Sequence, residues 1–146
     1  MGSLQAANTA TQTITFSVAA INELSVSGNP AALAITSATA GSDPSSVSDT
    51  STTYAVTTNQ TGQKITAALN TAMPTGTSLH LTLGAPSGAS SSGSVALSTT
   101  ASNVVTSIST LAQAGNSIGY SFSATSAAGQ ISSTTRTVTL TLTAGP

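Results

Sequence analysis

The residues of this sequence that could carry out catalysis are a serine in a glycine-flanked motif and a single histidine. Gly115-Asn116-Ser117-Ile118-Gly119 has the Gly-x-Ser-x-Gly spacing of a nucleophile elbow. That motif needs a strand before it, a helix after it and a histidine later in the chain to activate the serine. The only histidine, His80, lies upstream, and the pattern after Ser117 favours a strand. In a chain this rich in glycine and serine, we interpret the motif as a turn that enters a strand.

The residues that could hold a metal ion are equally few. A metal site normally requires two or more convergent ligands, and His80 alternates with leucines, so we expect it on an outer sheet face. The carboxylates are Glu23, Asp43 and Asp49. Asp43 and Asp49 share a predicted polar loop over residues 41–51 and could bind Ca²⁺ together with backbone carbonyls, or they could cap turns. They lack the Asp-x-Asp spacing, so we favour capping and predict no catalytic residue, metal or cofactor, and no enzyme activity.

The composition also argues against nucleic acid, membranes and sugars as partners. Only 3% of the 146 residues are charged and the net charge is −1, which gives no field to attract nucleic acid. No apolar run approaches the roughly 20 residues of a membrane span. Sugar-binding modules use exposed aromatic rings, but the chain has no tryptophan. Tyr54 is left open, and the remaining aromatics fall on apolar phases and are predicted to lie in the core: Phe16, Tyr120 and Phe122.

Alternation of apolar and hydroxyl side chains is the main structural signal. In Thr11-Gln12-Thr13-Ile14-Thr15-Phe16-Ser17-Val18 the apolar residues hold the even positions, which is typical of a half-buried strand. The same pattern predicts further strands around residues 24–26, 33–35, 54–56, 65–69, 79–83, 95–97, 118–124 and 138–142. Residues 58–62 and 74–76 read as turns. About eight to nine short strands predict an all-β fold, an antiparallel β-sandwich of immunoglobulin-like architecture.

Two segments leave room for helix. Ile65, Leu69 and Met73 are spaced by four residues, but the threonine-rich surroundings favour a strand. Residues 102–112 are compatible with one helical turn, and their serine and threonine content makes a short crossover the better interpretation.

The chain is long enough for one domain with its own core, without help from disulfides, because it has no cysteine. More than a third of the residues are serine or threonine. We assign residues 1–10 to a flexible N-terminus that includes a leader-like Met1-Gly2-Ser3, and residues 11–146 to a single β-sandwich domain. No signal peptide opens the sequence, and a mature secreted chain fits this composition. Asn59-Gln60-Thr61 is a glycosylation sequon, with meaning only in a suitable secretory host.

Two sets of residues are candidates for interaction. The first is the strand 11–18, in which Ile14, Phe16 and Val18 point the same way and no charge protects an edge. The second is a hydroxyl row on one face of the last strand: Thr135, Thr137, Thr139, Thr141 and Thr143. Both sets are equally compatible with ordinary strands that have an apolar inner face and a hydroxylated outer face.

These two segments, residues 11–18 and 136–143, together with the scarce charge, resemble prokaryotic surface-fibre subunits that assemble by donor-strand complementation. The chain departs from the classical chaperone–usher pilins, which usually contain a disulfide. The resemblance implies a secreted structural subunit of a filament or surface layer, whose partners are copies of itself and whose strand 11–18 fills a groove in a neighbour. The alternative is an extracellular binding module, either adhesin-like or ice-binding through the threonine row.

Overall fold

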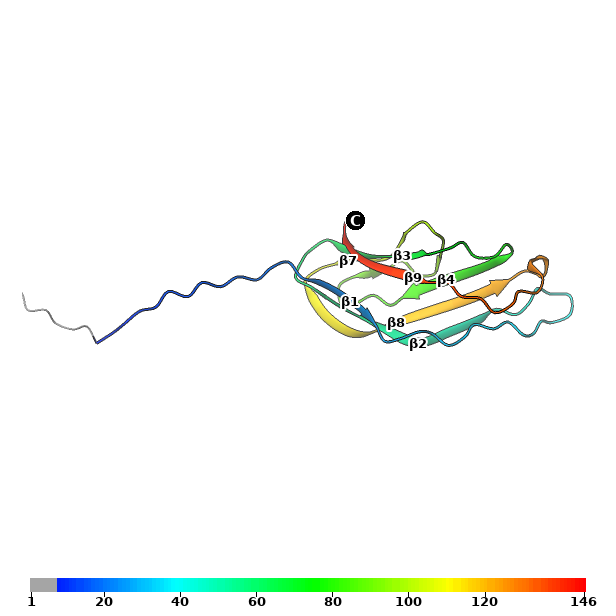
Figure 1. Ribbon diagram of the computed structural model, residues 1–146, viewed down its shortest axis with the longest axis horizontal. Helices are drawn as coiled ribbons and strands as arrows, with labels where there is room; N and C mark the ends of the chain where they lie inside the picture. Colours follow the sequence, from blue (N-terminus) through cyan, green and yellow to red (C-terminus); the bar gives the residue numbers. More distant parts are fainter. Residues whose placement is uncertain (1–7) are drawn as a thin grey trace, which may run out of the picture.

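The computed structural model describes residues 8–146, and the leader-like residues lie outside this range. Nine strands form two antiparallel sheets that pack face to face (Figure 1). The five-stranded sheet has the order β1-β2-β8-β4-β6, and the four-stranded sheet has the order β5-β7-β3-β9. The predicted antiparallel β-sandwich is therefore confirmed. The strands are β1 (Asn22–Val26), β2 (Val47–Thr58), β3 (Gln63–Leu69), β4 (Thr77–Leu83), β5 (Ser90–Ser91), β6 (Val95–Ala96), β7 (Ser102–Ile108), β8 (Leu111–Ala124) and β9 (Val138–Ala144).

The core lies between the sheets and is built from alternate residues of the long strands. On β3, Ile65, Ala67 and Leu69 are buried, and the residues between them are only half-buried. On β4, Leu79, Leu81 and Leu83 alternate in the same way. This two-residue period is the one that the sequence predicted, and it rules out the helical interpretation of residues 65–73. Each such buried aliphatic side chain contributes roughly 1.5–3 kcal/mol.

Several predicted elements differ from the structure. Residues 102–112 contain no helical turn. They form β7, which ends at Ile108, and the start of β8, which begins at Leu111. The predicted loop 41–51 is shorter, because β2 already begins at Val47. Residues 33–35 form no strand, and the only pairing nearby is an isolated bridge between Ala38 and Pro44. At residues 102–112, which are rich in serine and threonine, pairing with neighbouring strands overrides the weak local propensity.

The aromatic residues were partly misassigned. Tyr54, left open by the sequence, is 1% exposed in the core and its hydroxyl donates to the carbonyl of Gly84. Burial raises the pKa of Tyr54 to about 12. Tyr120 and Phe122 pack against the core and are partly buried, as expected. Phe16 is 87% exposed, so its prediction as a core residue is wrong.

The N-terminal segment stands apart from the sandwich. The first strand begins at Asn22, and residues 8–20 run away from the sheets as an extended arm (Figure 1). All residues from 8 to 21 are exposed. Among the described residues, the hydrophobic core uses none before Leu24. The segment 11–18 therefore has the pattern of a strand but no strand partner within residues 8–146.

Candidate functional site

The exposed arm, defined here as residues 8–20, is the most unusual surface of the molecule. Ile14, Phe16 and Val18 are 75%, 87% and 78% exposed, the highest values among the large hydrophobic side chains of the described residues. They occupy one face of the extended segment, and Thr13, Thr15 and Ser17 occupy the other. Large exposed apolar groups in a row mark an interaction surface, because leaving them in water is unfavourable.

The base of the arm is held by one side chain, Asn59, at the end of β2. Its Oδ1 accepts from the backbone N–H of Ile21 at 2.8 Å, and its Nδ2 donates to the carbonyl of Ala19 at 2.8 Å. The backbone N–H of Asn59 also donates to the carbonyl of Ile21 at 3.2 Å. The backbone of Asn59 thus extends the β1–β2 pairing by one residue, to Ile21, and its side chain reaches on to Ala19. The amide fixes where the arm leaves the sandwich, and the sequence analysis did not assign it this role.

A second hydrogen-bonded group supports the same corner. Thr58 Oγ1 donates to Asn22 Oδ1 at 2.6 Å, and Gln60 Nε2 donates to Asn59 Oδ1 at 2.8 Å. The chain then turns through Gly62, whose φ of 62° lies in the left-handed region that glycine adopts without strain. The predicted turn over residues 58–62 corresponds to the connection 59–62 between β2 and β3, because Thr58 still belongs to β2. This corner carries the polar groups that position the arm.

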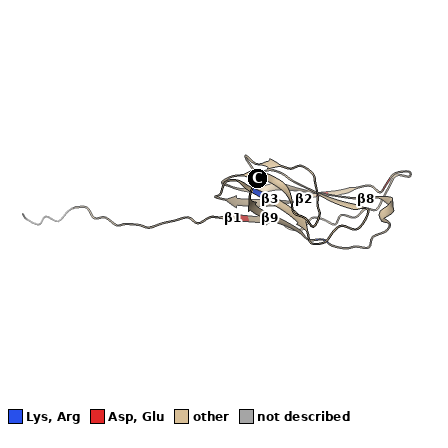
Figure 2. Cartoon of the chain, turned by 90° about the horizontal axis from the view of Figure 1, so that it is seen from above, with Lys and Arg blue, Asp and Glu red and all other residues tan. Residues whose placement is uncertain are grey.

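The arm carries no charge, and neither does the strand β9 at the other end of the chain. Charged side chains on edges normally prevent strands of different molecules from pairing. Figure 2 shows how few positions along the described chain carry a charged residue. Neither segment therefore has the electrostatic protection that most exposed strands have.

β9 is the long free edge of the four-stranded sheet. Within the described part of the chain it pairs only with β3, in a register that places Leu142 opposite Ile65, Leu140 opposite Ala67 and Val138 opposite Leu69. The three β3 residues are 0–4% exposed, because β3 has strands on both sides. Val138, Leu140 and Leu142 face the same core and remain only half-buried. The apolar face of the sandwich thus ends in a row that is incompletely covered.

The predicted threonine row belongs to the opposite face of the same strand. Thr139 and Thr141 are exposed, Thr143 is half-buried, and Thr135 and Thr137 precede β9. On the neighbouring strand β3, the residues opposite Thr139, Thr141 and Thr143 are Ala68, Thr66 and Lys64 respectively. The hydroxyls therefore form a single line, which only Thr66 extends onto the neighbouring strand.

The serine motif is not arranged as a nucleophile elbow. All five residues from 115 to 119 lie inside β8, without the strand-to-helix turn that the motif requires. The backbone of Ser117 bonds to Gly84, whereas His80 is paired with Ser121, four residues farther along the same ladder. At about 3.4 Å per residue, His80 and Ser117 are separated by roughly 13 Å. A proton relay needs hydrogen-bond contact between its members, and this pair lacks it.

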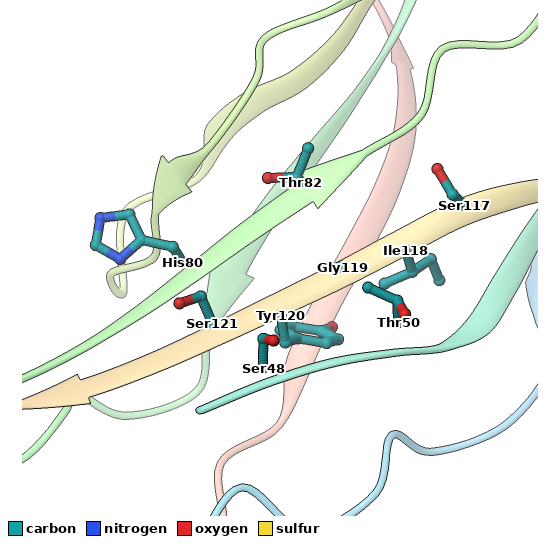
Figure 3. Close-up of a pocket in the computed structure, with 9 residues that line it drawn as sticks. All are labelled: Ser48, Thr50, His80, Thr82, Ser117, Ile118, Gly119, Tyr120 and Ser121. Atoms are coloured by element: carbon teal, nitrogen blue, oxygen red, sulfur yellow. The ribbon is translucent and has the colours of Figure 1, made fainter. Parts of the chain in front are cut away.

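A shallow groove on the outer face of the five-stranded sheet lies between these residues (Figure 3). Gly119 forms its floor because it has no side chain, and His80, Thr82, Ser121 and Thr50 surround it. Its polar side chains are the short hydroxyls of serine and threonine, with His80 and Tyr120. Within residues 8–146, no hydrogen bond joins a serine or threonine hydroxyl of the groove to His80 or to a carboxylate, as activation of a nucleophile would require.

The carboxylates do not converge. Asp43 accepts from the backbone N–H and the hydroxyl of Ser126 at 2.9 and 3.0 Å, at the start of a short 3-10 turn, Ser126–Ala128. These hydrogen bonds lower the pKa of Asp43. Asp49 accepts from the backbone N–H and the hydroxyl of Ser51. Asp49 therefore caps backbone two residues away in the chain, whereas Asp43 caps a turn 83 residues away. Within residues 8–146 no three metal-ligating side chains gather.

No family model matches this sequence, and no curated protein matches it. Among the described residues, no helix is long and apolar enough to cross a membrane.

Proposed function

We propose that this chain is a structural subunit of an extracellular filament or surface layer, and that copies assemble by β-strand complementation. The observation that carries the proposal is the arm: an extended, uncharged segment whose Ile14, Phe16 and Val18 are 75–87% exposed and contribute nothing to their own core. A segment of this kind has the side-chain pattern of a strand but belongs to no sheet. Adding an extended peptide to an exposed sheet edge is a recurring mode of protein recognition.

The energetics are consistent with a stable contact. Each of the three apolar side chains would gain roughly 1.5–3 kcal/mol on full burial. Each backbone hydrogen bond formed along the strand would add about 0.5–1.5 kcal/mol. The arm is already extended and anchored at Asn59, so less conformational entropy is lost than for a free peptide.

The extracellular location belongs to the same proposal. It is supported by the abundance of serine and threonine, which supply solubility through hydroxyl groups where charge is scarce. A net charge of −1 leaves little repulsion between copies, which favours self-association.

The test is the removal of residues 1–20, which leaves every core residue in place. The full chain should form polymers visible by size-exclusion chromatography and negative-stain microscopy, and the truncated domain should stay monomeric with nearly unchanged thermal stability. A synthetic peptide of residues 11–18 should bind the truncated domain. A full chain that stays monomeric at high concentration after prolonged incubation contradicts the proposal, as does a truncated domain that still polymerises.

The alternative is a binding module that uses the line of threonines on β9. Exposed Thr139 and Thr141 are the observation in its favour. A line one strand wide offers less regular surface than a threonine array that spans several strands, so we rank it second. Thermal hysteresis of the monomeric protein, abolished by Thr139→Tyr, would support the ice-binding form, and its absence at high protein concentration would exclude that form.

A further inference from the structure

We infer that the free edge of β9 is the surface that receives the arm of a second copy, with Phe16 of the incoming arm opposite Leu140. This inference rests on the proposed self-assembly and adds the acceptor, the partner segment and the register. It follows from three features of β9: its unpaired backbone, its half-buried apolar row and the order of its side chains.

The first feature is the direction of the backbone groups. The carbonyl of Thr137 accepts from the N–H of Asn70 at 3.0 Å, and the N–H of Gly145 donates to the carbonyl of Gly62 at 3.0 Å. In an antiparallel ladder alternate residues bond to a given partner, so the odd-numbered residues of β9 bond to β3. The N–H and C=O groups of Val138, Leu140 and Leu142 therefore point toward the free edge, where they can pair with another strand.

The second feature is the apolar row. Val138, Leu140 and Leu142 are half-buried, whereas their β3 neighbours are 0–4% exposed. The difference arises because β3 is flanked by two strands and β9 by one. An added strand with apolar side chains on its inner face would give β9 the same coverage.

The third feature is the match between the two segments. The arm carries three apolar residues at every second position, and so does β9: Ile14, Phe16 and Val18 on the arm, and Val138, Leu140 and Leu142 on β9. Directly opposed residues of paired strands project to the same face. With Phe16 opposite Leu140, all six apolar side chains face the core for either direction of insertion. The hydroxyls of Thr13, Thr15 and Ser17 then continue the exposed line formed by Thr139 and Thr141.

The other edges of the sandwich suit the arm less well. On the far side the edges are β5 and β6, which have only two residues each. The intervening chain is bound to both sheets there, since Ser92 donates to Val104 and Leu97 donates to Leu79. β1 is five residues long, and its alternate positions are Asn22, Leu24 and Val26, so it offers two apolar side chains where the arm has three. β9 offers seven residues, and the arm is seen to run away from its own sandwich (Figure 1). These features select a second copy as the occupant.

The test uses cysteine cross-linking, which is clean here because the chain has no cysteine of its own. Full-length Thr15→Cys is mixed with full-length Thr141→Cys or Thr139→Cys, which lie opposite Thr15 in the antiparallel and parallel registers respectively. Opposed positions on adjacent strands have Cα atoms about 4.5–5.5 Å apart, within the range of a disulfide. The matched control is Thr66→Cys, which faces Thr141 on β3 and lies one strand farther from the edge.

We expect at least about tenfold more disulfide-linked dimer with position 141 or 139 than with Thr66→Cys, because about 9–10 Å separates alternate strands. Mass spectrometry of the linked peptides should identify the pair. Polymers that lack these cross-links would show that β9 does not receive the arm. Cross-links from Thr15→Cys to Ser25→Cys on β1 would show the same. Either result would overturn this inference and leave the proposed assembly standing. A double variant, Thr15→Cys with Thr141→Cys, tests whether the arm folds back onto β9 of its own chain. If its cross-links form only within one molecule, the chain's own arm occupies the edge and the inference is overturned. A chain that forms no polymer at all contradicts the proposed function, and this inference with it.

Discussion

The arm and β9 lie near opposite ends of the chain and have nearly the same sequence pattern, yet only β9 is a strand. Both alternate apolar residues with hydroxyls, and neither carries a charge. β9 pairs with β3 over seven residues and half-buries Val138, Leu140 and Leu142. In the part of the chain that the structure describes, the arm pairs with nothing beyond its base, and Phe16 is 87% exposed. Alternation determines which side chains share a face, whereas an available sheet edge determines whether the segment becomes a strand.

The largest effect is expected from a charge at Phe16, which should weaken assembly without affecting the folding of the monomer. Phe16→Asp should leave the stability of the monomer unchanged within about 0.5 kcal/mol, because the side chain is exposed there. The same change should weaken assembly by at least about 100-fold, since a carboxylate would enter an apolar contact. Analytical ultracentrifugation and thermal melts measure the two effects on the same samples.

Thr15→Asp is the matched control for that experiment. It adds the same charge one residue away, on the face that carries hydroxyls, and should weaken assembly far less. Equal loss of assembly in both variants would show that any charge on the arm prevents assembly. The apolar face of the arm would then have no special role in the contact.

An intermediate effect is expected from truncating equivalent core residues on β3 and β9. Ile65→Ala, at a fully buried position, should lower the free energy of unfolding of the monomer by about 2–5 kcal/mol. Leu140→Ala, at a half-buried position, should cost clearly less in the monomer and more in the polymer, where the edge would be covered. Chemical denaturation of the truncated domain, with and without the arm peptide, measures this difference. Equal costs for Leu140→Ala with and without peptide would argue that β9 does not receive the arm.

The smallest effect concerns the anchor of the arm. Asn59→Ala removes the hydrogen bonds to the N–H of Ile21 and to the carbonyl of Ala19. Each exposed bond contributes about 0.5–1.5 kcal/mol at most, so global stability should change little and the amide of Ile21 should exchange with solvent faster. Asn59→Asp keeps the acceptor for Ile21 and should preserve most of that protection. Unchanged exchange at Ile21 in the alanine variant would show that the side chain does not hold the arm.

Much of the sandwich could be predicted from the sequence, because its long strands alternate cleanly. The β4 leucines and the β3 residues Ile65, Ala67 and Leu69 are buried as the two-residue period indicates. The segments that were misassigned have weak local signals: residues 102–112 pack as two strands, and 33–35 pack without a ladder. At residues 102–112, which are rich in serine and threonine, pairing with the neighbouring strands decides the conformation.

The sequence by itself determined the two faces of each segment, since side-chain alternation follows from the geometry of extended backbone alone. It therefore placed Ile14, Phe16 and Val18 on one face, and the threonines of β9 on another. Only the tertiary structure decided that Phe16 is outside the core and Tyr54 inside it, that β9 is a free edge, and that Asn59 holds the arm. Those facts depend on contacts between residues far apart in the chain, which local periodicity does not encode.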